Sequence, residues 1–237
     1  YIMNSIPIVY ENQEILIVNK PQGVAVQGGQ NIAHPLDKEL SLQLGYKIYL
    51  VHRLDQETKG LLVVAKSSEA ANKWTKLISE KSVRKEYDAL CIGVPKEKKG
   101  QFKSSIKEQG VEKSALTFYE VKNTWQVEDF TLSHIHLTLA TGRMHQIRIH
   151  LAKAGFPIVA DDKHGNFKAN KVLKKIVGIK RLQLVSSKLT LPIDGKEIIF
   201  EVIPELKPCD GFLQNSIYHA YDVYIHTVKS VALSKKD

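Results

Sequence analysis

A polar segment from His52 to Gly60 carries the residue types best suited to chemistry in this sequence, and apolar runs flank it on both sides. Loops held at both ends by rigid elements commonly carry catalytic groups. The functional interpretation is that Asp55 is a carboxylate kept ionised by neighbouring cations such as Arg53. The alternative is an ordinary connection in which Asp55 accepts backbone hydrogen bonds and Arg53 is a surface partner.

A second polar cluster runs from Thr141 to His150 and contains Arg143, His145 and Arg148. The spacing predicts a helix over 144–154, and cations near a helix N-terminus oppose its dipole by about 0.3–1 kcal/mol each. Free N–H groups and several cations together form an anion site suited to phosphate or to a carboxylate. The alternative is a solvated basic face. His145 and Arg148 are three residues apart and share one face of the helix.

Metal ligation is not expected from the histidines. His145 and His150 are five residues apart and lie on different helix faces. His134 and His136 alternate on a strand but lack a Cys or Glu ligand at a recognisable spacing. The sequence also contains no phosphate-binding or dinucleotide-binding glycine motif and no nucleophile elbow. We therefore expect neither a metal nor a cofactor.

Tyr87 lies near the start of an expected strand over 84–92. It is either a core aromatic whose hydroxyl finds one partner or a platform on which a base stacks. Periodicity alone does not choose between these two roles.

The elements that must position these residues form an α+β pattern, because strands follow one another too often for regular βαβ alternation. A helix is expected from Ser67 onward, with Ser67 or Ser68 as its N-cap. A terminal helix is expected near residues 212–228, where Leu213, Ile217, Tyr221, Tyr224 and Val228 mark one face. The expected strands are 14–19, 48–51, 61–65, 84–92, 101–106, 115–121, 130–140, 182–191 and 197–203.

The composition is that of a globular, basic protein. The 237 residues are 43% hydrophobic, which excludes intrinsic disorder, and 34 Lys and Arg against 25 Asp and Glu give a net charge of +9. A positive balance points to a polyanion such as nucleic acid.

The longest apolar run, 61–65, is too short to span a membrane. Cys91 and Cys209 fit no metal or disulfide framework, and we expect a reducing, cytoplasmic setting.

Five blocks in order resemble the RluA family of pseudouridine synthases, over about residues 10–205. The resemblance is closest to the family's ribosomal large-subunit synthase C branch. The blocks are Ile17-Val18-Asn19-Lys20-Pro21-Gln22-Gly23, His52-Arg53-Leu54-Asp55 with Thr58 and Gly60, Lys85-Glu86-Tyr87, Thr141-Gly142-Arg143 with His145-Gln146-Ile147-Arg148 and His150, and Gly155-Phe156-Pro157-Ile158 leading to Asp161.

The resemblance implies a catalytic fold with a mixed, mainly antiparallel sheet and flanking helices. It implies an isomerase that converts uridine to pseudouridine in RNA, most closely in large-subunit ribosomal RNA. Asp55 matches the essential aspartate, Tyr87 the tyrosine that stacks on the target base, and Arg148 the arginine paired with the aspartate. His52, Arg53, Arg143, His145 and Gln146 are expected to bind substrate. The alternatives are a tRNA enzyme of the same family and a non-catalytic RNA-binding or ribosome assembly protein.

Residues 1–206 are expected to form the catalytic domain and residues 207–237 a C-terminal helical extension, in a monomer. An N-terminal RNA-binding domain of the S4 type, which relatives often carry, is not expected in this sequence. The sequence departs from the family pattern at Lys59, His164 and Val185, where Ser, Tyr and His are usual. The departures leave the three central residues in place but put the choice of target uridine in doubt.

Overall fold

The computed structural model describes residues 5–29, 32–204, 206 and 223–227. Within these residues the chain forms four helices and eleven strands. The helices are α1 (Leu36–Leu44), α2 (Ser68–Ser79), α3 (Gln146–Lys153) and α4 (Phe167–Ile176). The strands are β1 (Ile8–Glu11), β2 (Ile15–Lys20), β3 (Tyr49–Leu50), β4 (Lys59–Ala65), β5 (Arg84–Ile92), β6 (Lys99–Glu108), β7 (Val111–Val127), β8 (Phe130–Leu139), β9 (Leu184–Ile193), β10 (Lys196–Val202) and β11 (Val223–Thr227).

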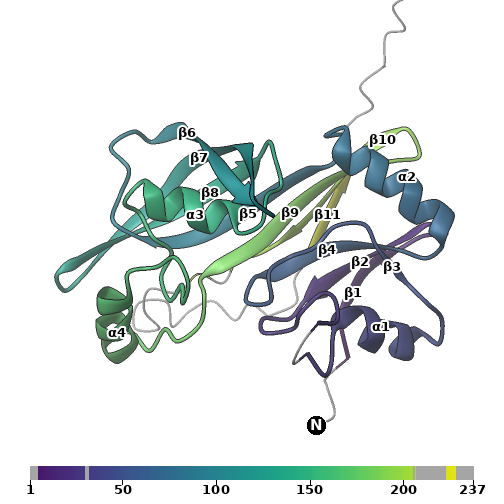
Figure 1. Ribbon diagram of the computed structural model, residues 1–237, viewed down its shortest axis with the longest axis horizontal. Helices are drawn as coiled ribbons and strands as arrows, with labels where there is room; N and C mark the ends of the chain where they lie inside the picture. The colour runs from purple at the N-terminus through teal and green to yellow at the C-terminus, as the bar shows by residue number, and fades with distance from the viewer. Residues whose placement is uncertain (1–4, 30–31, 205, 207–222, 228–237) are drawn as a thin grey trace, which may run out of the picture.

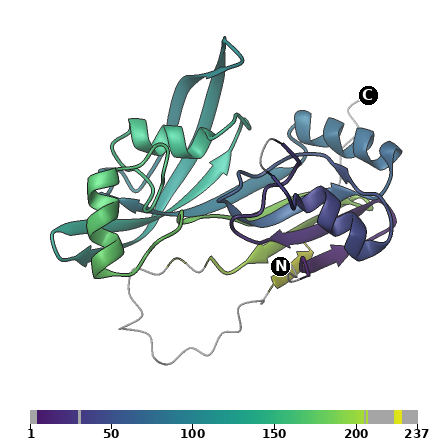
Figure 2. The same cartoon turned by 60° about the horizontal axis from the view of Figure 1, so that its bottom comes forward.

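All eleven strands belong to one sheet, whose main path runs β1-β2-β4-β9-β5-β8-β7-β6 (Figure 1). Every pairing is antiparallel except that of β4 with β9. One lobe contains β1 to β4 with α1 and α2, and the other contains β5 to β8 with α3 and α4 (Figures 1 and 2). This confirms the predicted α+β class with a mainly antiparallel sheet and flanking helices.

The apolar run 61–65 in β4 is buried on both faces of the sheet. Leu62 and Val64 pack into the cluster that includes the buried side chains of α1. Leu61 and Val63 point the other way, into the cluster that contains Trp74 of α2. The strand period of two thus sends alternate residues into two cores, which explains why the run is continuously apolar.

The two lobes meet where β4 runs beside β9, and this parallel pairing covers two residue pairs, Lys59 with Val185 and Gly60 with Ser186. Gly60 has φ +113°, and a Cβ there would lie 2.3 Å from the carbonyl oxygen of Ser186. A glycine is therefore required for the close approach of the two backbones. Because β4 begins directly after the polar loop, this contact also sets the position of Asp55.

Two expectations about helices differ from the structure. The helix expected over 144–154 begins at Gln146, because His145 adopts a left-handed conformation with φ 54° and cannot continue a right-handed turn. In the terminal helix expected over 212–228, residues 223–227, including Tyr224, form β11 instead. The open edge of β10 offers hydrogen-bond partners to this β-branched and aromatic segment, and pairing overrides the helical spacing. The rest of that prediction lies outside the described residues.

No helix among the described residues has the length and apolar character needed to cross a bilayer.

The Gly60 contact predicts a large stability difference between two glycine substitutions. Gly60→Ala should lower the free energy of unfolding by about 3 kcal/mol or more, since it adds a backbone overlap to an unfavourable φ. Gly110→Ala is the matched control, because Gly110 has φ +82° but no atom lies within 4 Å of the position its Cβ would take, and it should cost about 1–2 kcal/mol. Urea denaturation of both variants measures the difference; equal losses would contradict the overlap.

Candidate active site

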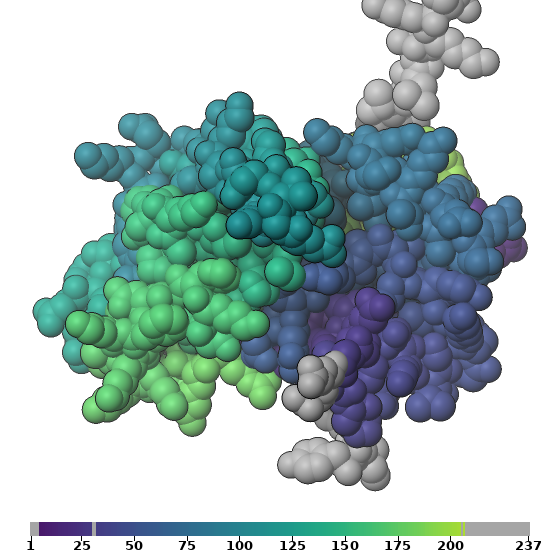
Figure 3. Space-filling view, in the orientation of Figure 1, coloured from purple at the N-terminus to yellow at the C-terminus, as the bar shows by residue number. Residues whose placement is uncertain are grey.

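A single cleft of about 820 Å³ brings together all eight residues predicted for the site. It opens between the two lobes and appears as a hollow in the space-filling view (Figure 3). The predicted residues in its lining are His52, Arg53, Asp55, Tyr87, Arg143, His145, Gln146 and Arg148. The residues come from the β3–β4 loop, from β5 and from the segment around the start of α3, so the cleft depends on tertiary structure.

Arg148 is the most buried charge in the cleft, with 3% of its side chain exposed. Its Nε donates to Asp161 Oδ2 at 2.8 Å and its Nη2 to Asp161 Oδ1 at 2.6 Å, a bidentate pair. Nη2 also donates to Asp162 Oδ1 at 3.0 Å. Burial works to lower the pKa of Arg148, but the hydrogen bonds to Asp161 and the negative charges of Asp161, Asp55 and Asp162 together raise it above its ordinary value, so the guanidinium stays charged.

Asp55 lies on the remaining corner of that guanidinium, with Oδ2 3.6 Å from Arg148 Nη1. Its Oδ1 lies 3.8 Å from His145 Nε2. Among the described residues, no backbone N–H hydrogen-bonds to the Asp55 carboxylate, although Thr58 N donates to its backbone oxygen. The backbone hydrogen bond that one interpretation of the loop expects Asp55 to accept is therefore made by its main-chain oxygen and not by its carboxylate. Its carboxylate faces the cleft between two nitrogen-bearing side chains.

The loop that carries Asp55 is held by the turn after β2. Lys20 is fully buried, and its Nζ lies 2.7–3.0 Å from the carbonyl oxygens of Pro21, Val24 and Gln56. Burial lowers the pKa of Lys20 to about 7, yet three carbonyl acceptors require the three N–H groups of the ammonium form. Gln22 Nε2 also donates to the carbonyl oxygen of Glu57 at 2.8 Å. This turn, for which the sequence alone indicated no role, therefore fixes the residue next to Asp55.

Tyr87 enters the same cleft from β5, on the strand face opposite Asp88. Burial, and then the negative charge of Asp55, raise the pKa of Tyr87 above its ordinary value. Its hydroxyl therefore stays protonated and does not provide a phenolate base. The ring packs with the main core, as the first interpretation of Tyr87 expects, and it also lines the cleft.

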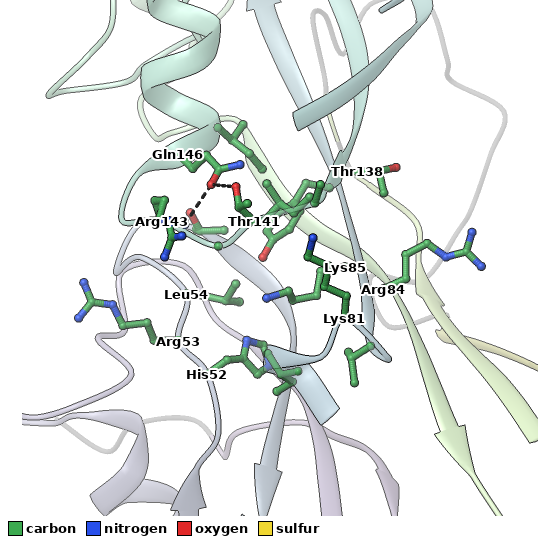
Figure 4. A pocket seen from close by; sticks show the side chains of 18 of the residues that line it. His52, Arg53, Leu54, Lys81, Arg84, Lys85, Thr138, Thr141, Arg143 and Gln146 are labelled. Carbon is green, nitrogen blue, oxygen red and sulfur yellow. Dashed lines mark hydrogen bonds between the residues drawn. The ribbon is translucent and has the colours of Figure 1, made fainter. Parts of the chain in front are cut away.

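His52 and Arg53 behave differently, although they are neighbours. His52 Nε2 accepts a hydrogen bond from Val63 N at 3.1 Å, so its proton is on Nδ1. Burial, and secondarily the charge of Lys85, lower the pKa of His52 to about 3. His52 is thus a neutral group that ties the loop to β4. Arg53 is exposed at the cleft rim (Figure 4).

Gln146 supports the wall of the cleft. Its Oε1 accepts from Thr141 Oγ1 at 2.7 Å and from Arg143 N at 3.0 Å. Its Nε2 donates to Leu116 O at 3.0 Å and to Thr117 Oγ1 at 2.9 Å. With 2% exposure and all four hydrogen-bonding positions used, Gln146 differs from the expected substrate-binding residue. Its hydrogen bonds shape the turn that presents Arg143 (Figure 4).

His145 connects Asp55 to a second histidine. Its Nδ1 lies 2.9 Å from His164 Nε2, and burial lowers the pKa of both rings. We assign the shared proton to His164, because His145 then presents its Nε2–H, rather than a lone pair, to the Asp55 carboxylate. His145 precedes α3 and is left-handed, so it does not share a helix face with Arg148 as their spacing predicts, yet both side chains approach Asp55.

Cations beyond the eight predicted site residues also line the cleft. Lys81 lines it from the segment before β5, and Arg84 and Lys85 line it from the start of β5 (Figure 4). A Cβ at Gly142 would lie 3.4 Å from Lys85 Nζ, so this lysine reaches the turn before α3. Six Lys and Arg side chains line the cleft against three carboxylates. The excess of positive charge suits a polyanionic ligand.

A separate polar network lies on the opposite face of β5. His136 Nδ1 is 3.2 Å from Asp88 Oδ1 and its Nε2 is 3.3 Å from Glu86 Oε1, while His134 and Ser187 also contact Asp88. The hydrogen bonds with Asp88 and then Glu86 raise the pKa of His136 to about 9. In the described part of the chain, no group of three or more His, Cys, Asp or Glu residues is arranged to hold a metal ion.

The environments of His52 and His136 predict opposite titration behaviour. His52 should stay neutral down to about pH 3, and His136 should stay protonated up to about pH 9. Because its folded pKa is raised, His136 contributes stability that is complete below about pH 6.5 and is lost as the pH rises through 9. Because its folded pKa is lowered, His52 makes the fold less stable as the pH falls below about 6.5.

NMR titration of the ring nitrogens checks both values, with His52→Gln and His136→Gln assigning the signals. A His52 ring that protonates near pH 6.5 would show that it is not held as the structure indicates.

Comparison with known proteins shows the family of the chain. Residues 14–153 match the family described as RNA pseudouridylate synthase, and the chain belongs to that family. It is 36% identical to the ribosomal large subunit pseudouridine synthase C of Rickettsia felis, over 82% of this chain and 66% of that protein. It is 32% identical to the protein of the same name from Salmonella typhimurium, over 88% of this chain and 70% of that protein.

Another relative, the synthase C of Rickettsia conorii, is 38% identical over 67% of this chain and 56% of its own length. The chain thus spans less than two thirds of the length of the two Rickettsia relatives.

Solved structures show the same fold. Human RNA Pseudouridylate Synthase Domain Containing 1 superposes with a TM-score of 0.71 at 24% identity, covering 96% of this chain and 91% of that chain. Human RNA Pseudouridylate Synthase Domain Containing 4 superposes with a TM-score of 0.69, covering 84% and 88% of the two chains.

Proposed function

We propose that the chain is an RNA pseudouridine synthase that isomerises uridine in large-subunit ribosomal RNA. The observation that carries this proposal is the placement of Asp55, Arg148 and Tyr87 around one cationic cleft in a chain of this family. The names of the synthase C relatives support a ribosomal target. A basic chain whose cleft has an excess of cations suits an RNA substrate.

The reaction breaks the N1–C1′ bond of uridine and forms a C5–C1′ bond, with loss of the C5 proton and gain of a proton at N1. It involves no net oxidation and no net hydrolysis. Glycoside hydrolysis usually needs a second carboxylate to protonate the leaving group, but uracil leaves as a delocalised anion. One carboxylate therefore suffices, and Asp55 acts from the sugar side.

The surroundings of Asp55 suit that role. Arg148 Nη1 stabilises and orients its negative charge from 3.6 Å, without occupying its oxygens in a short hydrogen bond. The Tyr87 ring holds the base, and its protonated hydroxyl lies near enough to Asp55 to feel its charge. A uridine inside folded RNA must be flipped out to reach this depth, at a cost of a few kcal/mol that stacking and phosphate contacts offset.

The first functional test compares two carboxylates that both approach Arg148. Asp55→Asn should lower the rate of pseudouridine formation by at least about 10²–10⁴-fold while RNA binding persists, because the reacting carboxylate is lost. Asp162→Asn is the matched control, since Asp162 lies 3.0 Å from Arg148 Nη2 but its side chain is 68% exposed, and most activity should remain. The readout is pseudouridine mapping in unmodified ribosomal RNA. Near-normal turnover by Asp55→Asn would contradict the proposal.

A second test separates the ring of Tyr87 from its hydroxyl. Tyr87→Phe should lower kcat with little change in KM, because it removes only the group beside Asp55. Tyr87→Leu should also raise KM, since a lost base-stacking contact is worth about 1–3 kcal/mol. Steady-state kinetics on one RNA transcript distinguishes the two effects; identical kinetics for both variants would exclude stacking on Tyr87.

A further inference from the structure

We propose that α4 is a second RNA-binding surface, which holds RNA flanking the uridine in the cleft. This inference deepens the proposed function and rests on it for the nature of the ligand. The first observation is the positive charge of the segment that contains α4. Residues 163–181 contain seven cations and no carboxylate, a net +7 within a chain whose total is +9. The cations are Lys163, Lys168, Lys171, Lys174, Lys175, Lys180 and Arg181.

The helix sorts its residues into a packed face and a cationic face. Ala169 and Leu173 are buried, and Leu173 belongs to the small core cluster beneath the helix. At 100° per residue, the side of the helix opposite them carries Phe167 and four lysines, all exposed. None of these four lysines, Lys168, Lys171, Lys174 and Lys175, forms an ion pair with a described carboxylate. The charge is therefore available to a ligand.

Lys174 and Lys175 in the last turn suit the helix dipole, but the residues at the start of α4 do not serve its stability. The first turn contains no acidic residue, and Lys168 stands where the helix dipole disfavours a cation. Phe167 is 60% exposed beside it, so an aromatic ring is left in water at the same end. An exposed aromatic ring among lysines is the combination that binds single-stranded nucleic acid, through base stacking and phosphate contacts.

The surface is joined rigidly to the cleft. Asn170 of α4 donates from Nδ2 to the carbonyl oxygen of Asp161 at 3.1 Å and accepts from Ala160 N at 2.9 Å. Asp161 is the partner of Arg148 in the active site. The segment from Asp161 to Asn166, which ends at the N-cap of α4, therefore links the bottom of the cleft to this helix. The view of Figure 3 shows the region of α4, in bright green, on the same side of the molecule as the hollow. RNA that leaves the cleft on this side meets α4.

The test uses the full chain with an unmodified transcript of large-subunit ribosomal RNA. Lys168→Gln/Lys171→Gln removes two cations from the end of α4 nearest the cleft. The change should not harm folding, because it also relieves the dipole. Lys38→Gln/Lys47→Gln is the matched control: it removes the same charge from two exposed lysines of the other lobe that do not line the cleft.

The salt slope is the slope of the logarithm of affinity against the logarithm of salt concentration. For single-stranded RNA, each lost phosphate contact makes this slope shallower by about 0.7, which weakens binding about fivefold at 0.1 M salt. The α4 variant should therefore bind about 25-fold more weakly at 0.1 M salt, with a slope shallower by about 1.4. KM should rise with kcat unchanged at saturating RNA, because the lysines do not touch the reacting atoms. The control should match the unaltered chain in every measurement.

Phe167 is tested separately. Phe167→Ala should weaken binding by about fivefold or more with the salt slope unchanged, whereas Phe167→Tyr should retain affinity. Equal affinity of the Lys168→Gln/Lys171→Gln chain and its control would overturn the proposal, even if pseudouridine forms normally. Binding that depends on α4 in a chain that forms no pseudouridine would instead overturn the proposed function and leave the surface in place.

Discussion

The buried pair of Arg148 and Asp161 is the interaction on which the site depends. With 3% and 1% of their side chains exposed, these two charges are favourable only when their geometry is close to ideal. Two parallel hydrogen bonds supply that geometry, and they leave Nη1 as the corner that faces Asp55. Asp161 is fixed in turn by the amides of Lys163 and His164. The orientation of Arg148 toward Asp55 is thus set by hydrogen bonds that do not involve Asp55.

The same pair explains why the carboxylate oxygens of Asp55 are left without a short hydrogen bond to Arg148. Arg148 is surrounded by three carboxylates, and the two that hold it in place occupy Nε and Nη2. Asp55 receives the third and longest contact, so its charge is favoured without its oxygens being consumed. Lys20 adds buried positive charge beneath the loop and binds the backbone next to Asp55, so the carboxylate is positioned by its main chain rather than by its side chain.

The sequence predicted the residues that line the cleft more completely than the helices and strands around them. The strands with a clear pattern of apolar residues and the N-cap of α2 at Ser67 were predictable, because the local sequence determines them. The meeting of Asp55, Tyr87 and Arg148 followed from the family resemblance, since no local pattern joins three distant segments. The bend at His145 was not predictable, because a left-handed residue other than glycine is stabilised by tertiary contacts. Helix α4 was missed because lysines outnumber its few buried residues.

The two lobes share the site, so its geometry depends on the seam between them. Asp55 belongs to the loop before β4, whereas Tyr87 and Arg148 come from the lobe built on β5 and α3. At the seam, β4 and β9 pair over only two residues, and the rest of β9 pairs with β5 and β10. Because this pairing is so short, a shift of one lobe relative to the other would change the distance between Asp55 and Arg148. The close backbone approach at Gly60 therefore fixes the two halves of the cleft at one separation.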